Sequence, residues 1–184
     1  MAAACLILAH AQTAKHAAVL PPCVPLINPY SSTSNALLLL DNAPGPADPL
    51  EYLKEFFTQH PKQKVMVAGH SKGGNLSLYA SALQEESVQN RIQQIYCWDA
   101  PGVHRSILNT EGYQRVVSKA KRYIPQDSIV GLMLESQVPY HIIESQGSGI
   151  SQHSALMWNI EEDHFVELTE LTRNSQLTDQ TFKQ

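Results

Sequence analysis

The stretch that decides the fold is Lys64-Val65-Met66-Val67-Ala68-Gly69-His70-Ser71-Lys72-Gly73-Gly74. Residues 64–68 form a short valine-rich apolar run, typical of a strand buried on both faces of a parallel sheet. Residues 69–73 fit G-x-S-x-G, the pattern of a serine on a strained strand-to-helix turn, where small residues two positions before and after the serine leave room for neighbouring backbone. The residues so assigned are Ser71 as the nucleophile and, as elbow glycines, Gly69, Gly73 and Gly74.

The plainer alternative is a glycine-rich turn that only lets a helix pack on a sheet. A phosphate-binding loop would need G-x-x-x-x-G-K-[S/T] or G-x-G-x-x-G, and neither spacing occurs at this turn. The nucleophile is therefore the favoured interpretation of residues 69–74, the segment called the elbow below.

Outward from the elbow, strand and helix patterns alternate along the chain. Alternation at this spacing indicates βαβ units and a mostly parallel sheet, so the expected fold class is α/β. The expected elements are a helix over 50–57, a strand over 64–68, a helix over 74–90, and strands over 92–98, 121–124 and 138–144, with a helix over 111–120 between the second and third strands.

A serine hydroxyl becomes a nucleophile when a general base, usually a histidine oriented by a carboxylate, removes its proton. In hydrolases with an elbow, the acid and then the histidine follow the serine along the chain, on loops after later strands. Asp127 follows the strand over 121–124 and His153 lies in the loop after the strand over 138–144. We expect Asp127 to be the acid and His153 the base, with Asp99 as the alternative acid.

Three other histidines are candidates for the base, and each is better explained by a structural or solvent-exposed position. His70 is expected to pack under the elbow, with its side chain pointing away from Ser71. His141 alternates with isoleucine inside a strand pattern and is expected to be a packed or edge residue. His164 follows three acidic residues and is expected in a solvated turn. None of the three is the expected base.

Composition limits the partners and divides the chain. The 184 residues carry 13 Lys+Arg and 17 Asp+Glu, a net charge of −4 that argues against nucleic acid as a partner. Residues 1–50 hold only three charged side chains and seven of the 11 prolines. We therefore expect a low-charge, Ala/Pro-rich segment over 1–50, weakly ordered or divergent, and one globular domain over 51–184.

Cysteine usage and hydropathy bear on the compartment. Cys5, Cys23 and Cys97 are odd in number and widely spaced, which favours reduced cytoplasmic thiols over a disulfide framework or a metal site. Residues 1–11 resemble a signal peptide without its basic start, so secretion is the less favoured alternative. The longest apolar run without charge, 36–40, is too short to span a bilayer, so no membrane span is expected.

Residues 62–182 resemble the lipase-type α/β hydrolases, and most closely the bacterial, largely uncharacterised Mbeg-like family. The resemblance rests on four blocks in order, 68–76, 98–102, 123–131 and 149–153. It implies a three-layer α/β-hydrolase-like sandwich that hydrolyses a carboxylic ester or lipid without metal or cofactor. It also implies Ser71 as nucleophile, His153 as base and Asp127 as acid.

The chain departs from this family pattern upstream of the elbow. Such enzymes hold the oxyanion with two backbone N–H groups, one from the residue after the nucleophile, here Lys72, and one from an earlier loop. The family's earlier loop has an arginine-glycine-threonine-aspartate-like stretch, which this chain lacks; 37–40 followed by Asp41-Asn42 is the nearest substitute. The N-terminal side of the fold is thus expected to be incomplete, with self-association through an unpaired sheet edge. The alternative function is an impaired hydrolase-like fold serving as a binding or assembly module.

Overall fold

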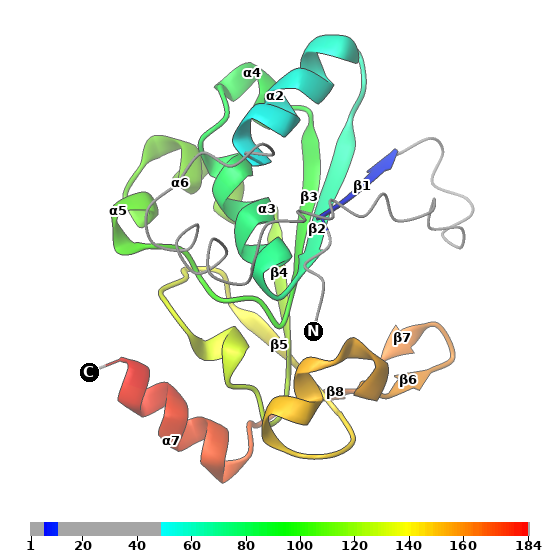
Figure 1. Cartoon of the computed structure of the whole chain (residues 1–184), viewed down its shortest axis with the longest axis vertical. Coiled ribbons are helices and arrows are strands. Elements are labelled where there is room, and N and C mark those ends of the chain that lie inside the picture. Colours follow the sequence, from blue (N-terminus) through cyan, green and yellow to red (C-terminus); the bar gives the residue numbers. More distant parts are fainter. Residues whose placement is uncertain (1–5, 11–48, 184) are drawn as a thin grey trace, which may run out of the picture.

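The computed structural model describes residues 6–10 and 49–183 of the chain (Figure 1). The α-helices are α2 (Pro49–Gln59), α3 (Lys72–Ala82), α4 (Glu86–Gln89), α5 (Arg105–Leu108), α6 (Glu111–Val117) and α7 (Arg173–Phe182). The strands are β1 (Leu6–His10), β2 (Val65–His70), β3 (Ile92–Trp98), β4 (Ala120–Pro125), β5 (Tyr140–Ile143), β6 (Ile160–Glu161), β7 (His164–Phe165) and β8 (Glu167–Leu168). Three 3-10 helices are η1 (Val130–Leu132), η2 (Gly149–His153) and η3 (Ala155–Met157).

The strands form a mixed sheet in the order β1-β2-β3-β4-β5-β8, and β6 and β7 form a separate hairpin. Strands β2 to β5 run parallel to one another, whereas β1 and β8 are edge strands that pair antiparallel with β2 and β5. The predicted α/β class with a mostly parallel sheet is thus confirmed. The predicted strands correspond to β2, β3, β4 and β5, because each is a short segment with several β-branched or aromatic residues between turn residues.

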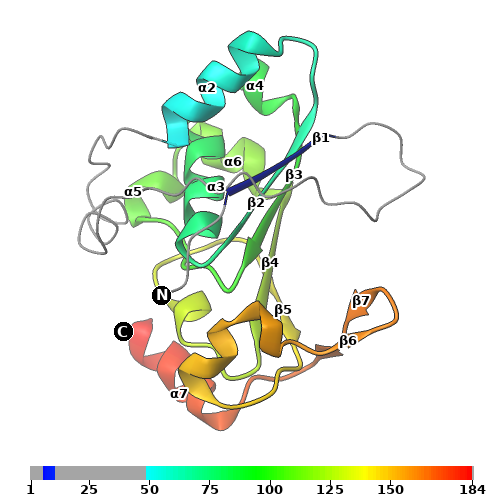
Figure 2. The same ribbon diagram turned by 45° about the vertical axis from the view of Figure 1, so that its right-hand side comes forward.

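Helices α2 to α6 lie together on one side of this sheet (Figures 1 and 2). The main core lies between them and strands β2 and β3; its fully buried side chains include Leu53, Phe57, Leu78, Ile95 and Tyr113. In the described part of the chain, no α-helix forms a layer on the opposite face of β2 to β4. The described residues thus build a helical layer and a sheet, and the expected three-layer arrangement stays a prediction (Figures 1 and 2).

The helix expected over 74–90 is divided into α3 and α4. Gln89, on α4, is buried, and its side-chain amide donates to the carbonyls of Ser81 and Ala82, at 2.9 and 3.0 Å. These carbonyls belong to the last turn of α3 and have no partner within that helix. A tertiary hydrogen bond thus ends α3 early, which hydrophobic periodicity does not reveal.

Strand β1 changes the expectation for the N-terminal side of the sheet. It pairs antiparallel with β2, with Leu6 opposite Gly69 and His10 opposite Val65. The edge of β2 is therefore paired, and the unpaired edge that suggested self-association is not present here. The rest of the predicted segment 1–50, apart from the start of α2, lies outside the described residues.

Candidate active site

Ser71 occupies the junction between β2 and α3. Its backbone has φ 57° and ψ −129°, a conformation that residues other than glycine rarely adopt. Its N–H donates to the carbonyl of Trp98 at 2.8 Å, and the Ser71 carbonyl accepts from Gly74 N–H at 3.0 Å. These bonds join β3, the turn and the first turn of α3. The strained serine predicted from the G-x-S-x-G pattern is thus present in the backbone geometry.

Two of the elbow glycines are needed for close packing. A Cβ atom on Gly69 would lie 2.2 Å from the carbonyl carbon of Gly73, which is backbone and has little freedom to move. A Cβ atom on Gly74 would lie 2.5 Å from Cβ of Ala100. The strand before Ser71 and the helix after it can approach this closely only without these side chains.

His153, the last residue of η2, brings its imidazole to Ser71. Its Nε2 lies 2.9 Å from Oγ of Ser71, and its Nδ1 lies 2.6 Å from Oδ2 of Asp99. Because a carboxylate only accepts, Nδ1–H donates to Asp99, and Nε2 is left to accept the Ser71 hydroxyl proton. This is the arrangement that general-base activation of a serine requires.

The expectation that Asp127 orients His153 is wrong in this structure; Asp99, the alternative acid, does so. Asp99 is 1% exposed. Its second oxygen, Oδ1, accepts from the Ser128 hydroxyl at 2.5 Å and from Gly131 N–H at 3.0 Å. Both carboxylate oxygens therefore have hydrogen-bond donors, which a buried charge requires.

The carboxylate of Asp127 forms hydrogen bonds with other groups. Its Oδ2 accepts from Gly149 N–H at 2.5 Å and its Oδ1 from the Thr172 hydroxyl at 2.5 Å. Its own N–H donates to the side chain of Gln152 at 2.9 Å. Asp127 thus ties the loop that carries His153 to the start of α7, without contacting the imidazole in this structure.

The strand order explains which aspartate reaches the histidine. Strand β3 is the direct neighbour of β2, so Asp99, just after β3, lies one strand spacing of about 4.8 Å from the elbow strand. Strand β4 lies one spacing further, so Asp127 starts about twice as far away. Both aspartates lie between Ser71 and His153 in the chain, so sequence order alone could not separate them. The sequence signal that favours Asp99 is its place at the end of the strand that directly follows the elbow strand and its helix.

His70 also contacts the histidine, which the sequence did not predict. Its Nε2–H donates to the His153 carbonyl at 2.6 Å, and the two imidazole rings have their centres 4.6 Å apart. Its ring thus lies against His153 instead of packing under the elbow. Burial lowers the pKa of His70, while the hydrogen bond to the His153 carbonyl opposes this shift. A neutral His70 supports the backbone of the residue that faces Ser71.

Replacing His70 with glutamine is expected to change how stability depends on pH. In the unfolded chain a histidine takes up a proton near pH 6.5, whereas folded His70 stays neutral to lower pH. The unfolded state then binds more protons, so His70 lowers the free energy of unfolding as the pH falls through 6.5. The stability advantage of the wild type over His70→Gln, about 1 kcal/mol at pH 8, should shrink at pH 5. Urea unfolding of both proteins at the two pH values measures it; an advantage that is constant with pH contradicts it.

Lys72 is the first residue of α3, where the helix dipole favours negative charge. Its backbone N–H follows Ser71 directly, as expected of an oxyanion donor. The Lys72 side chain is mostly buried, and this burial lowers its pKa to about 8. The upstream segment considered for a second donor, 37–42, lies outside the described residues.

The other singled-out residues lie apart from Ser71. His141 stacks on Tyr123, with ring centres 4.9 Å apart, and its Nδ1 is 3.0 Å from a carboxylate oxygen of Glu167. His164 is exposed in the β6–β7 hairpin. Cys97 is a buried free thiol, and burial raises its pKa to about 12, which makes it a poor nucleophile. Cys5 and Cys23 lie outside the described residues.

The described residues contain neither a metal-binding cluster nor a helix that could span a membrane. Within residues 6–10 and 49–183, no three His, Cys, Asp or Glu side chains are grouped so as to hold a metal ion. No helix in the same part of the chain combines the length and the apolar character needed to cross a bilayer.

Comparison with known proteins places the chain in a family. The model of the Mbeg1-like family matches residues 38–184, which include the elbow, Asp99, Asp127 and His153. Neither the curated proteins nor the solved structures contain a significant match. The resemblance to the Mbeg-like family is thus confirmed, whereas the resemblance to lipase-type α/β hydrolases stays a prediction. Since the match covers most of the sequence, the chain belongs to the Mbeg1-like family.

Proposed function

We propose that this protein is a serine hydrolase that cleaves carboxylic esters, with an α/β-hydrolase-like fold. The observation that supports the proposal is the continuous chain of hydrogen bonds from Ser71 Oγ through His153 to Asp99. It begins at a serine with φ 57° on a strand-to-helix turn. Such a strained backbone is expensive to maintain, and strain of this kind concentrates at functional sites.

In the proposed reaction, Ser71 Oγ attacks the ester carbonyl carbon while His153 Nε2 takes the hydroxyl proton. The tetrahedral intermediate collapses, the bond to the alcohol oxygen breaks, and His153 returns the proton to that oxygen, which leaves as the alcohol. A water molecule then attacks the acyl-enzyme in the same way and releases the carboxylic acid and free Ser71. Asp99 keeps the Nδ1–H tautomer of His153 and stabilises the imidazolium that forms at each step.

The negative oxygen of the intermediate needs hydrogen-bond donors in a fixed position. We assign the Lys72 N–H to this role, because it begins α3 and so lies at the positive end of the helix dipole. Loss of one such donor typically lowers the rate by about 10²–10³. A protein with only one donor would hydrolyse esters slowly. Such a protein would fit the alternative function, an impaired hydrolase-like fold that serves as a binding or assembly module.

A fluorophosphonate probe tests the proposal, because it phosphonylates only a serine with an activated hydroxyl. We expect the wild type and the matched control Ser87→Ala, a change at an exposed serine, to be labelled, and Ser71→Ala to remain unlabelled. Chromogenic p-nitrophenyl esters of two to twelve carbons would then show the preferred acyl length. Labelling that persists in folded Ser71→Ala would overturn the assignment. A folded wild type without labelling or turnover would support the binding-module alternative instead.

A further inference from the structure

The face of the sheet that points away from α3 carries a row of aromatic side chains. The thiol of Cys97 contacts the Gly74 carbonyl, so the alternating residues Tyr96 and Trp98 lie on the other face. Across the sheet, Trp98 pairs with Tyr123 of β4, and Tyr123 with His141 of β5. Residues paired in this way share a face, so one surface presents neighbouring rings from three strands.

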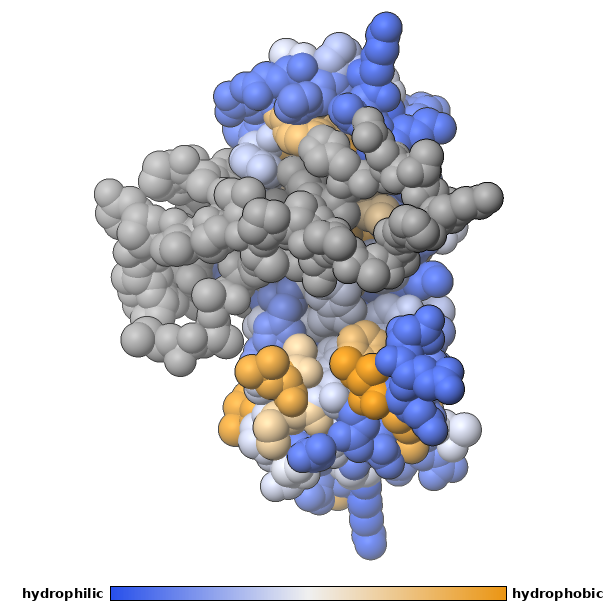
Figure 3. Space-filling model, turned by 90° about the vertical axis from the view of Figure 1, so that its right-hand side faces the viewer, coloured by the Kyte–Doolittle hydropathy of each residue, from blue (hydrophilic) through white to orange (hydrophobic). Residues whose placement is uncertain are grey.

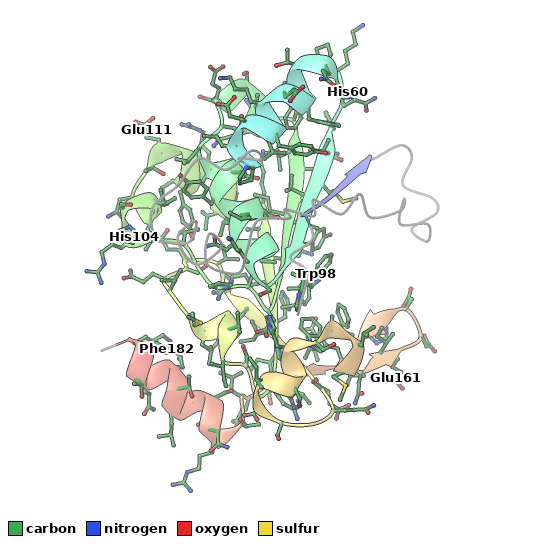
Figure 4. The ribbon with its side chains drawn as sticks, in the orientation of Figure 1. His60, Trp98, His104, Glu111, Glu161 and Phe182 are labelled. Carbon is green, nitrogen blue, oxygen red and sulfur yellow. The ribbon has the colours of Figure 1, made fainter. Side chains whose placement is uncertain are left out.

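Of this row, Tyr96, Trp98 and Tyr123 line a cavity of about 640 Å³ between the sheet and the β6–β7 hairpin. This volume is within the usual range for small-molecule sites. Trp98 and Glu161 lie on the same side of the molecule in Figure 4. The sheet contributes Tyr96, Trp98 and Tyr123, and the chain from β6 to β8 contributes Glu161, Asp163, His164, Phe165, Val166 and Glu167.

Ring contacts hold the aromatic walls in place. The rings of Tyr96 and Trp98 are nearly parallel, with a 12° angle and centres 6.1 Å apart. Phe165 of the hairpin packs against two further aromatic rings, with its ring centre 6.0 Å from that of Tyr123 and 5.4 Å from that of Trp158. The cavity is thus bounded by aromatic rings on both the sheet and the hairpin side, and each half-buried ring leaves part of its surface open.

The charge of the cavity has one sign. Its described lining includes the carboxylates of Glu161, Asp163 and Glu167 but no lysine or arginine. The pKa of Tyr123 is raised by burial and, to a lesser extent, by Tyr96 and Glu167, so its hydroxyl stays neutral near pH 7. Seen from this side in Figure 3, hydrophilic and hydrophobic side chains lie next to one another below the grey atoms. An anion would be repelled here, and a cation would be attracted by the three carboxylates. Of these, Glu167 also contacts His141, and Asp163 also contacts His164.

We infer that this cavity binds a small organic ammonium ion, in particular a quaternary one. Aromatic faces attract such cations, which are weakly hydrated and shed water more readily than an inorganic ion. Carboxylates at the rim add attraction without the need for direct coordination. The described residues of the cavity contain no group of metal ligands, so an inorganic divalent ion is not the ligand that they suit.

The site is next to the proposed catalytic residues but does not depend on them. Trp98 directly precedes Asp99, and its carbonyl accepts from the Ser71 N–H. None of the cavity's lining side chains belongs to the hydrogen-bonded chain from Ser71 to Asp99. Binding of an ammonium ion should therefore be unchanged in Ser71→Ala, and this result separates the inference from the proposed ester hydrolysis.

Calorimetric titration of the full chain with choline, and with its neutral counterpart 3,3-dimethylbutan-1-ol, tests the inference. The two ligands have nearly the same shape, so a difference in affinity reports the positive charge. We expect choline to bind at least tenfold more tightly, and this preference to fall as salt is added because the carboxylates are exposed. Equal affinity, or no choline binding at 50 mM, would overturn the inference.

Variants locate the binding to the cavity. Glu161→Gln combined with Glu167→Gln should weaken choline binding three- to tenfold, whereas the control Glu111→Gln, on α6, should leave it unchanged. Phe165→Leu should weaken it by a similar factor, and this hairpin variant avoids the risk that a change at Trp98 disturbs the neighbouring Asp99. Circular dichroism confirms that each variant is folded. Full choline affinity in both the folded double variant and folded Phe165→Leu would overturn the assignment to this cavity.

Discussion

Ser71→Ala, His153→Ala and the double variant are expected to lower kcat/KM for p-nitrophenyl acetate by nearly the same factor, about 10⁴–10⁶. The two side chains act as one unit, because Nε2 of His153 lies 2.9 Å from Oγ of Ser71 and its only proposed task is to move that proton. Once either is missing, the other has nothing left to contribute. Steady-state kinetics on the three variants, with active wild type as reference, measure the effect.

The double variant is the informative one. Independent contributions would multiply, so that it would be slower than either single variant by several further orders of magnitude. Ser87→Ala serves as the matched control, since that serine is exposed on α4 and belongs to neither the elbow nor the hydrogen-bonded chain from Ser71 to Asp99. Equal rates in wild type and His153→Ala would contradict the role assigned to the imidazole. Multiplying losses would contradict the hydrogen bond as the functional unit.

Asp99→Asn is expected to reduce kcat/KM about 10⁴-fold, whereas Asp127→Asn should reduce it less than tenfold. An asparagine at 99 can present its N–H₂ group to Nδ1 of His153, which favours the wrong tautomer and leaves Nε2 protonated. Asp127 has no contact with the imidazole, and its two oxygens accept from Gly149 N–H and the Thr172 hydroxyl. Kinetics on both variants, with wild type alongside, measure the ratio.

The free energy of unfolding also distinguishes the role of Asp127 from that of Asp99. Asp127→Asn weakens two charge-assisted hydrogen bonds that hold the His153 loop and the start of α7, so its free energy of unfolding should fall by about 1–3 kcal/mol. Its midpoint of thermal unfolding should fall accordingly while most activity remains. If instead Asp127→Asn proves inactive and Asp99→Asn retains activity, Asp127 is the acid, and the partners seen here for the two carboxylates do not describe the working site.

Much of the fold could be predicted because its signals are local. The valine run before the elbow is fully buried at Val65 and Val67, and the strand over 92–98 appears with the same limits as β3. Apolar periodicity and turn residues describe how a short segment meets its immediate surroundings. The elbow was equally predictable, since only glycine fits where a Cβ atom would lie within about 2–3 Å of backbone.

Long-range partners could not be predicted in the same way. The end of α3 depends on Gln89. Strand β1 lies in the Ala/Pro-rich segment 1–50, where no regular pattern of apolar residues predicted a strand. The hairpin over 160–165 was not anticipated either, and with it the wall that closes the aromatic cavity. The pairing of β1 with β2 and the contact of Phe165 with Tyr123 join residues distant in the chain, whereas Gln89 reaches carbonyls seven and eight residues away through its side chain. Composition and period carry no information about either kind of contact.

The sequence by itself determined the class of the fold, the strained position of Ser71 and the choice of His153 as its partner, because each follows from local backbone chemistry and chain order. Only the tertiary structure decided that Asp99, and not Asp127, faces His153. Both aspartates end strands and both precede the histidine. Strand β3 adjoins β2 in the sheet whereas β4 does not, and that spatial order brings one carboxylate within 2.6 Å of the imidazole and leaves the other to anchor its loop.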